Sequence, residues 1–167
     1  MNMRVHGRGG AGGSGATPIT HYTSPYEVGP HVVLTANTLL LIAAVIPASV
    51  TFANIAFHVG IADGVNNSDF GIYNAAGALL ANAGAQAMGS ATFSSFAAVQ
   101  GSQTIAAGLY FIAWTSAGSV LGVSYDTYCT GFYYNASFGV SVGGALPASI
   151  TPPALALNGN NASFALS

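Results

Sequence analysis

The most unusual feature of this 167-residue sequence is how little charge it carries. It contains no lysine, and charged residues make up 4% of it, against about 25% in an average soluble domain. They are Arg4, Arg8, Glu27, Asp63, Asp69 and Asp126. Because nucleic-acid binding needs several phosphate-neutralising Lys or Arg side chains, we expect no nucleic-acid partner. A surface so poor in charge does little to keep isolated copies apart, so we expect neighbouring subunits to cover much of it.

Cysteine and long apolar runs are also scarce. The single cysteine, Cys129, excludes an internal disulfide, and we expect it to be buried as a small apolar side chain. The richest apolar stretch, residues 38–50, has an uninterrupted core that ends at Pro47 and is far shorter than the ~20 residues that span a bilayer. No apolar run follows the N-terminal arginines, as a secretory signal would require. We therefore expect no membrane partner.

Metal-binding patterns are equally sparse, and we predict no cofactor. The four histidines are His6, His21, His31 and His58, and no HxH or HxxxH spacing occurs among them. Oxygen ligands gather in residues 62–69 (ADGVNNSD), but no Glu closes this stretch as in an EF-hand loop. Two interpretations of residues 62–69 stay open, a calcium site and a polar turn held by Asx-turns.

No arrangement of catalytic residues is recognisable. Serines are frequent, but no GxSxG nucleophile elbow occurs. Hydrolysis of a glycan needs two carboxylates that flank one bond, and nothing in the sequence indicates that any two of the four acids meet. The sequence therefore predicts a protein that is not an enzyme.

What the sequence does contain is a series of short apolar segments separated by turns, which predicts an all-β fold. In residues 50–61, Ile55, Phe57 and Val59 alternate with Ala56 and His58, so the first three face one side of a strand. Both faces of residues 109–115 carry bulky side chains, which indicates a central strand. We expect strands at 32–34, 39–46, 50–61, 70–73, 78–81, 91–96, 103–105, 109–115, 119–123 and 130–142.

Glycines mark the expected turns. Gly77 and Gly108 each precede an apolar strand and are expected to supply a positive φ. Residues 75–88 are rich in Ala and Leu, but Gly77 and Gly84 fall inside them and no apolar stripe has helical spacing. We expect strand and loop there rather than a helix.

The strand pattern predicts a two-sheet antiparallel β-sandwich of jelly-roll type with extended N-terminal and C-terminal arms, and an up-and-down barrel is the main alternative. Residues 1–31 are a Gly-rich arm and an extended lead-in, residues 32–146 form the sandwich, and residues 147–167 are a Pro-rich extended tail. Because the arm cannot build a core, we expect Arg4, Arg8 and their neighbours to attach to another subunit.

One group of aromatic and polar residues is a candidate contact for a glycan or a receptor. It consists of Tyr125, Asp126, Tyr128, Tyr133, Tyr134 and Asn135. Tyrosine rings beside Asn and Asp can stack on sugars and hydrogen-bond to them. Packing in the core or at an interface is the other interpretation, because tyrosine also favours those places.

Three segments carry a resemblance to a known family. They are VTFANIAFHV (50–59), DFGIYNAAGALLANAG (69–84) and IAAGLYFIAW (105–114). Together they resemble the β-jelly-roll domains of tailed-bacteriophage tail fibres, minor tail proteins and head decoration proteins. The shared residues are those of strands and turns, so the resemblance concerns the fold more than a site.

The resemblance implies a structural protein on the virion surface that assembles with itself, typically as a homotrimer, and contacts the major capsid or tail protein through its arms. The lead-in is too short for a fibre shaft, which favours a decoration protein that stabilises a capsid or tail. The alternative is a receptor- or glycan-binding fibre or spike module that binds a host-surface glycan. A further alternative is the subunit of a secreted, non-viral filament, whose arm completes a neighbour's sheet.

Overall fold

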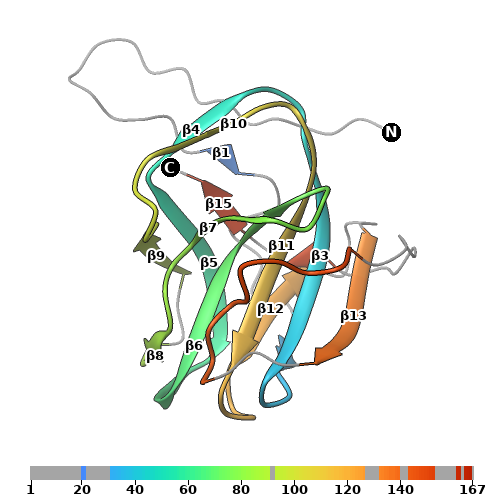
Figure 1. The fold of residues 1–167 in the computed structure, drawn as a ribbon. Coiled ribbons are helices and arrows are strands. Elements are labelled where there is room, and N and C mark those ends of the chain that lie inside the picture. The colour runs from blue at the N-terminus through green and yellow to red at the C-terminus, as the bar shows by residue number, and fades with distance from the viewer. Residues whose placement is uncertain are drawn as a thin grey trace, which may run out of the picture.

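The computed structural model describes residues 20–21, 31–90, 93–126, 132–139, 143–152, 161–162 and 164–166. These residues form an all-β, sandwich-like fold in which the sheets are antiparallel and no helix occurs (Figure 1). The prediction of an all-β antiparallel fold is confirmed.

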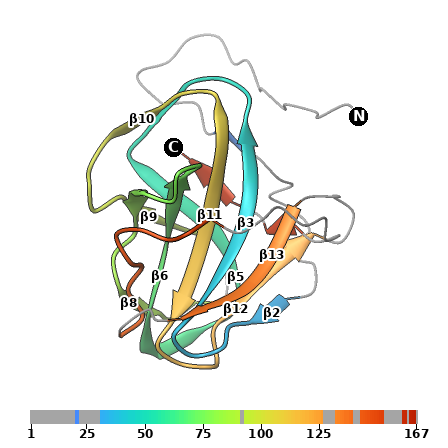
Figure 2. The same cartoon turned by 45° about the vertical axis from the view of Figure 1, so that its right-hand side comes forward.

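Two sheets face each other in Figures 1 and 2. The first has the order β1-β15-β5-β12-β14, with β2 attached to β12 and β9 attached to β5. Its strands are β1 (Thr20–His21), β2 (His31–Val33), β5 (Asn54–Ile61), β9 (Phe93–Ala97), β12 (Gly122–Asp126), β14 (Asn161–Ala162) and β15 (Phe164–Leu166). The second has the order β13-β3-β11-β6-β7, with β8 attached to β6. Its strands are β3 (Thr38–Ile46), β6 (Asp63–Asn74), β7 (Leu79–Asn82), β8 (Gln86–Met88), β11 (Gly108–Ser116) and β13 (Phe132–Gly139).

A long antiparallel ribbon connects the two sheets. β4 (Val50–Phe52) and β10 (Gln103–Ile105) form a small sheet of their own. Along the chain, β4 lies between β3 and β5, and β10 lies between β9 and β11. Gly108 pairs with Ile46 in the second sheet, and Ile105 pairs with Val50 in the small sheet. Beyond it, the ribbon continues in the first sheet with the pairing of β5 and β9. The two segments of the ribbon, β3-β4-β5 and β9-β10-β11, thus stay paired with each other while they cross from the second sheet to the first.

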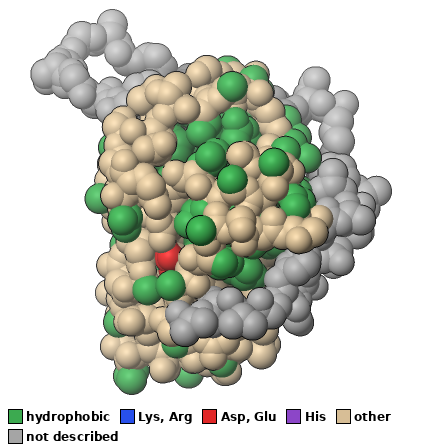
Figure 3. All heavy atoms as spheres, in the orientation of Figure 1, with side chains coloured by type: hydrophobic (Ala, Val, Ile, Leu, Met, Phe, Trp, Pro, Cys, Tyr) green, Lys and Arg blue, Asp and Glu red, His purple; other side chains and the backbone are tan. Residues whose placement is uncertain are grey.

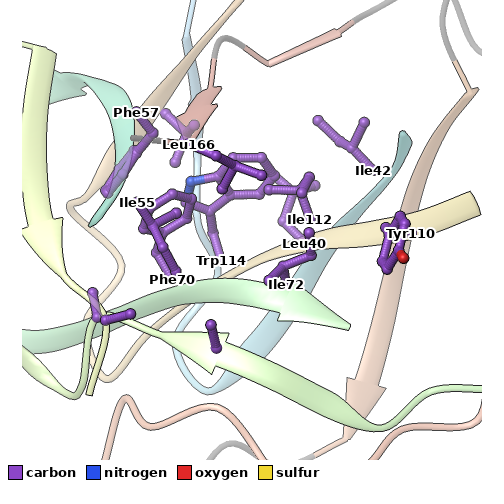
Figure 4. Packing of buried hydrophobic residues seen from close by; sticks show 14 of the residues in the cluster. Leu40, Ile42, Ile55, Phe57, Phe70, Ile72, Tyr110, Ile112, Trp114 and Leu166 are labelled. Carbon is purple, nitrogen blue, oxygen red and sulfur yellow. The ribbon is translucent and has the colours of Figure 1, made fainter. Parts of the chain in front are cut away.

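The main core fills the space between the two sheets and is centred on aromatic rings (Figure 4). Phe70 stacks on Trp114 with ring centroids 5.7 Å apart, and Phe57 lies against Phe70 at 4.2 Å. All three side chains are fully buried. Aromatic pairs at these distances add to the free energy gained from burying their area. Leu166 of β15 is buried in the same cluster, so the end of the chain contributes to the core.

The central position expected for residues 109–115 is confirmed. β11 pairs with β3 on one side and with β6 on the other. Tyr110, Ile112 and Trp114 face the main core, whereas Phe111 and Ala113 belong to a second apolar cluster on the outer face of the second sheet. Both faces of this strand are therefore buried.

The second cluster is covered by residues 143–150, which we call the covering segment. Leu146 is buried against the sheet, and Ile150 packs at the margin of the same cluster. The Leu79 amide donates to the Ala148 carbonyl at 3.0 Å, and the Ile150 amide donates to the Gly77 carbonyl at 2.8 Å. Gly77 has a φ of 84°, as the sequence predicts, and a Cβ there would collide with the Ile150 carbonyl.

Several local expectations were correct and others were not. Ile55, Phe57 and Val59 are buried in the core, and residues 75–88 are strand and loop. The prediction that Gly108 is a turn residue with positive φ was wrong, because Gly108 begins β11 in extended conformation. The strand expected at residues 70–73 is longer than predicted, because β6 already begins at Asp63 and pairs irregularly with β8 there.

Candidate functional site

The aromatic candidate residues are divided between the two sheets. Tyr125 and Asp126 end β12 of the first sheet, where they pair with Ala162 and Asn161 of β14. Tyr133 and Tyr134 lie on β13 of the second sheet, where they pair with Ile42 and Leu41 of β3. Asn135 follows them in β13. The backbone therefore puts the two halves of the predicted cluster on separate sheets, linked by residues 127–131.

Three further residues of the prediction lie outside the described residues. Tyr128 belongs to the segment between β12 and β13, and Arg4 and Arg8 precede β1. The glycan contact and the attachment arm stay predictions.

The acidic segment 62–69 contains a turn held by a side chain. Asp63 Oδ1 accepts hydrogen bonds from the amides of Val65 (3.1 Å) and Asn66 (3.0 Å), and Asp63 Oδ2 accepts one from Asn66 Nδ2 (3.0 Å). The bond from the Asn66 amide is the main reason why the pKa of Asp63 lies below its ordinary value of 3.8, and partial burial opposes it. Asp63 Oδ1 thus forms an Asx-turn, one of the two interpretations that the sequence left open, and Oδ2 is held by the Asn66 side chain.

The second carboxyl group of this segment is buried inside the protein. Asp69 is 1% exposed, and its Oδ1 accepts a hydrogen bond from the Phe70 amide at 2.7 Å. Its Oδ2 accepts two more, from Asn82 Nδ2 at 2.6 Å and from the Leu146 amide at 3.0 Å. Asp69 therefore joins β6 to β7 and to the covering segment, and each of its oxygens has a protein donor.

Asn82 extends this network towards the surface. Gln100 Nε2 donates to Asn82 Oδ1 at 2.6 Å, and the Asn82 amide donates to Gln100 Oε1 at 2.9 Å. The Val99 amide also donates to the Asn82 carbonyl at 2.8 Å. The side chain of Gln100 thus takes the place of a neighbouring strand at the outer edge of β7. We call Asp69, Asn82 and Gln100 the polar ladder.

Tyr73 lies four residues after Asp69 on β6, which is two side-chain repeats of the strand, and it also holds the covering segment. Its hydroxyl donates to the Pro147 carbonyl at 2.7 Å. Burial raises the pKa of Tyr73 far above its ordinary value of 10.0, and the nearby carboxyl group of Asp69 raises it further. The phenol therefore stays protonated and acts as a hydrogen-bond donor.

The remaining polar groups of the core are also structural. Tyr110 donates from its hydroxyl to the Ala106 carbonyl at 2.8 Å, and Ser68 donates to Ser116 at 2.9 Å. Buried tyrosine and tryptophan side chains usually find a hydrogen-bond partner for their polar atom, which holds for Tyr73 and Tyr110. The indole nitrogen of Trp114 is the exception, since it is buried without a hydrogen-bond partner in the described part of the molecule.

Within the described ranges, no three His, Cys, Asp or Glu side chains come together in a way that could hold a metal ion. His58 is half-buried on β5, where it pairs with Phe93 of β9. In those same ranges, no helix is long and apolar enough to cross a bilayer.

Comparison with known proteins adds no family to this picture. No family model matches the chain, and no curated protein matches it significantly.

Sequence reasoning did not find the polar ladder. Asp69, Asn82 and Gln100 are separated along the chain, and only the pairing of β6 with β7 brings the first two together. A visible signal was Asn82, which stands in the otherwise apolar segment ALLANA (78–83), since a buried polar side chain needs a partner.

Proposed function

We propose that this chain is a non-enzymatic structural protein of a virion surface, whose copies decorate and stabilise a phage capsid or tail. The observation that supports the proposal most strongly is the uncharged surface. Among the side chains that the structure describes, Asp63 and Asp69 are the only acidic ones, and they are 3% and 1% exposed. No Lys or Arg occurs among these side chains. The described part of the face in Figure 3 is almost entirely apolar or uncharged polar.

This surface suits a protein that is surrounded by neighbours. Soluble domains stay dispersed largely through exposed charges, which generate repulsion between copies. Here the two described carboxyl groups are used for internal hydrogen bonds instead. Contacts between uncharged surfaces bring no like charges together and leave no ion unpaired, so copies of this chain can pack closely against each other or against a shell.

We also propose that the sandwich is a jelly roll, with a homotrimer as the assembled unit. The ribbon of β3, β4 and β5 with β11, β10 and β9 supports the jelly roll, because such folds wrap long antiparallel pairs around a core shared by two sheets. The trimer is an expectation from the family resemblance.

The test is the abundance of this chain in virus particles purified from its source, measured by quantitative mass spectrometry against the most abundant shell protein. A copy number near that of the shell protein, or a simple fraction of it, is the expected result. A few copies per particle would contradict decoration and favour a receptor-binding spike. Absence from purified particles would refute the assignment to a virion.

A variant without residues 1–16 tests the attachment arm separately. We expect it to keep the melting temperature of the full chain, because those residues cannot contribute to a core, but to occupy fewer sites on particles. Occupancy equal to that of the full chain would show that the arm has no role in attachment.

A further inference from the structure

The outer edges of β7 and β9 differ in whether described residues form hydrogen bonds along them. The outer edge of β7 is occupied by the chain itself, because Leu79 bonds to Ala148 and Asn82 bonds to Gln100 and Val99. β9 pairs with β5 on one side, and no strand of the described residues pairs with its other side. In Figure 1, β9 lies at the left margin of the sandwich. Among the described residues, β9 is thus an edge strand of the first sheet.

The register shows which backbone groups of β9 point outward. The Ala98 amide donates to the Ala53 carbonyl at 2.8 Å, directly beyond the paired residues of β5 and β9. In an antiparallel pair, residues alternate between bonding to the partner strand and facing away from it. Phe96 therefore bonds towards β5, whereas Ser95 and Ala97 direct their amide and carbonyl groups to the open edge. The side chains of Ser95 and Ala97 are exposed, and Phe96 packs against the core.

This edge lacks two of the usual protections against strand pairing, a charged side chain and a proline. Edge strands are commonly blocked by lysine, by an inward-pointing charge or by proline. Residues 93–97 read FSSFA, and they contain neither a charge nor a proline. The small side chains of Ser95 and Ala97 leave the backbone accessible from the outside.

We infer that β9 pairs with β9 of a second copy of this chain across a twofold axis, so that the first sheet continues from one subunit into the next. An antiparallel edge is complementary to itself under a twofold rotation, because each outward amide then meets an outward carbonyl of the same strand. Pairing Ser95 with Ser95 of the second copy also places Ala97 opposite Phe93. No charge opposes the contact, since neither strand carries one.

This inference rests on the proposed function only in that the chain assembles with itself. A trimer formed through other surfaces is compatible with it, because the twofold contact then joins trimers to each other.

The first experiment measures the mass of the full chain and of Ser95→Pro by light scattering after size-exclusion chromatography. Proline at this position removes an outward amide but no bond to β5, so the fold is expected to persist. We expect the assembly of Ser95→Pro to fall to half its mass or less, whereas the control Ser95→Ala, which keeps the amide, behaves like the original chain. An unchanged mass for Ser95→Pro would overturn the edge pairing and leave self-assembly intact. A full chain that stays monomeric at high concentration would refute both.

A cross-linking experiment tests the contact without relying on proline. Cys129→Ser removes the natural thiol, and Ser95→Cys then places one thiol on each side of the twofold axis, about 5.5 Å apart between Cα atoms. A short bis-maleimide reagent should convert most of this variant to a covalent dimer. The control Ala48→Cys, an exposed position away from β9, should yield little dimer. Equal yields for the two variants would contradict the proposed contact.

Discussion

The polar ladder predicts that Asp69 fastens the covering segment to the second sheet. Asp69→Ala removes the acceptor of three hydrogen bonds, whose donors are the amides of Phe70 and Leu146 and the side chain of Asn82. All three bonds lie in a buried part of the protein, where water cannot easily replace the lost acceptor.

The size of the effect follows from the number of donors left without a partner. A buried donor that loses its acceptor costs about 1–3 kcal/mol. The substitution also removes a buried carboxyl group, whose desolvation opposes folding. We therefore expect the free energy of unfolding to fall by about 2–4 kcal/mol, a large part of the ~5–15 kcal/mol of an ordinary domain.

Urea denaturation measures this loss, and amide hydrogen exchange shows where it arises. We expect the midpoint of unfolding to fall with an unchanged slope, and the Leu146 amide to exchange faster than amides of β11. Ser68→Ala is the control, because Ser68 is a buried neighbour in β6 whose hydroxyl donates to Ser116 of β11, outside the covering segment. It should cost about 1 kcal/mol and leave Leu146 protected. A loss below about 1 kcal/mol for Asp69→Ala, or an unchanged exchange rate at Leu146, would refute the role of Asp69.

Three further predictions concern β6 and the hairpin that follows it. The pKa of Asp63 is lowered in the folded protein, so the contribution of this carboxylate to stability is complete above pH 3.8 and disappears as the pH falls through the folded pKa. Asp63→Asn should therefore make the stability of the protein less dependent on pH in the acid range. The pKa of Tyr73 is raised, so its contribution is present below its ordinary value of 10.0 and declines as the pH rises above it; Tyr73→Phe should remove that alkaline decline and cost about 1 kcal/mol at neutral pH. Gly77 and Gly101 both have positive φ, but only at Gly77 would a Cβ meet the Ile150 carbonyl, so Gly77→Ala should destabilise the fold by about 2 kcal/mol more than Gly101→Ala in the same denaturation assay.

Features that depend on the period of a single strand could be predicted from the sequence. The alternation of bulky residues in 109–115 identified a strand buried on both faces, and the alternation in 50–61 identified the residues that face the core. Burial on a strand follows the two-residue repeat of its side chains, so neither prediction needed knowledge of a partner strand.

Features that depend on distant pairing could not be predicted in this way. The start of β6 was missed because residues 62–69 are polar and have the composition of a turn, yet they extend the strand through an irregular pairing with β8. The polar ladder requires the register of β6 against β7 and the turn at Val99, which no local pattern encodes. The short strands of the C-terminal tail pair with β5 and β12, far away in the sequence.

The structure also separates two properties that the composition combines, high apolar content and low charge. Much of the apolar content is used within the fold, because the second sheet is covered on one face by the main core and on the other by the covering segment. The large apolar side chains left exposed in the described ranges are valines on separate elements: Val33, Val45, Val65, Val99 and Val120. Single exposed valines are ordinary for a soluble protein and do not indicate an apolar docking surface. The lack of charge is not explained by packing inside the fold. Its most direct effect is on the edges of the sheets, because a charged side chain is a common means of blocking an edge strand. Assembly of this chain is therefore expected to depend on backbone pairing at uncharged edges more than on burial of an apolar patch.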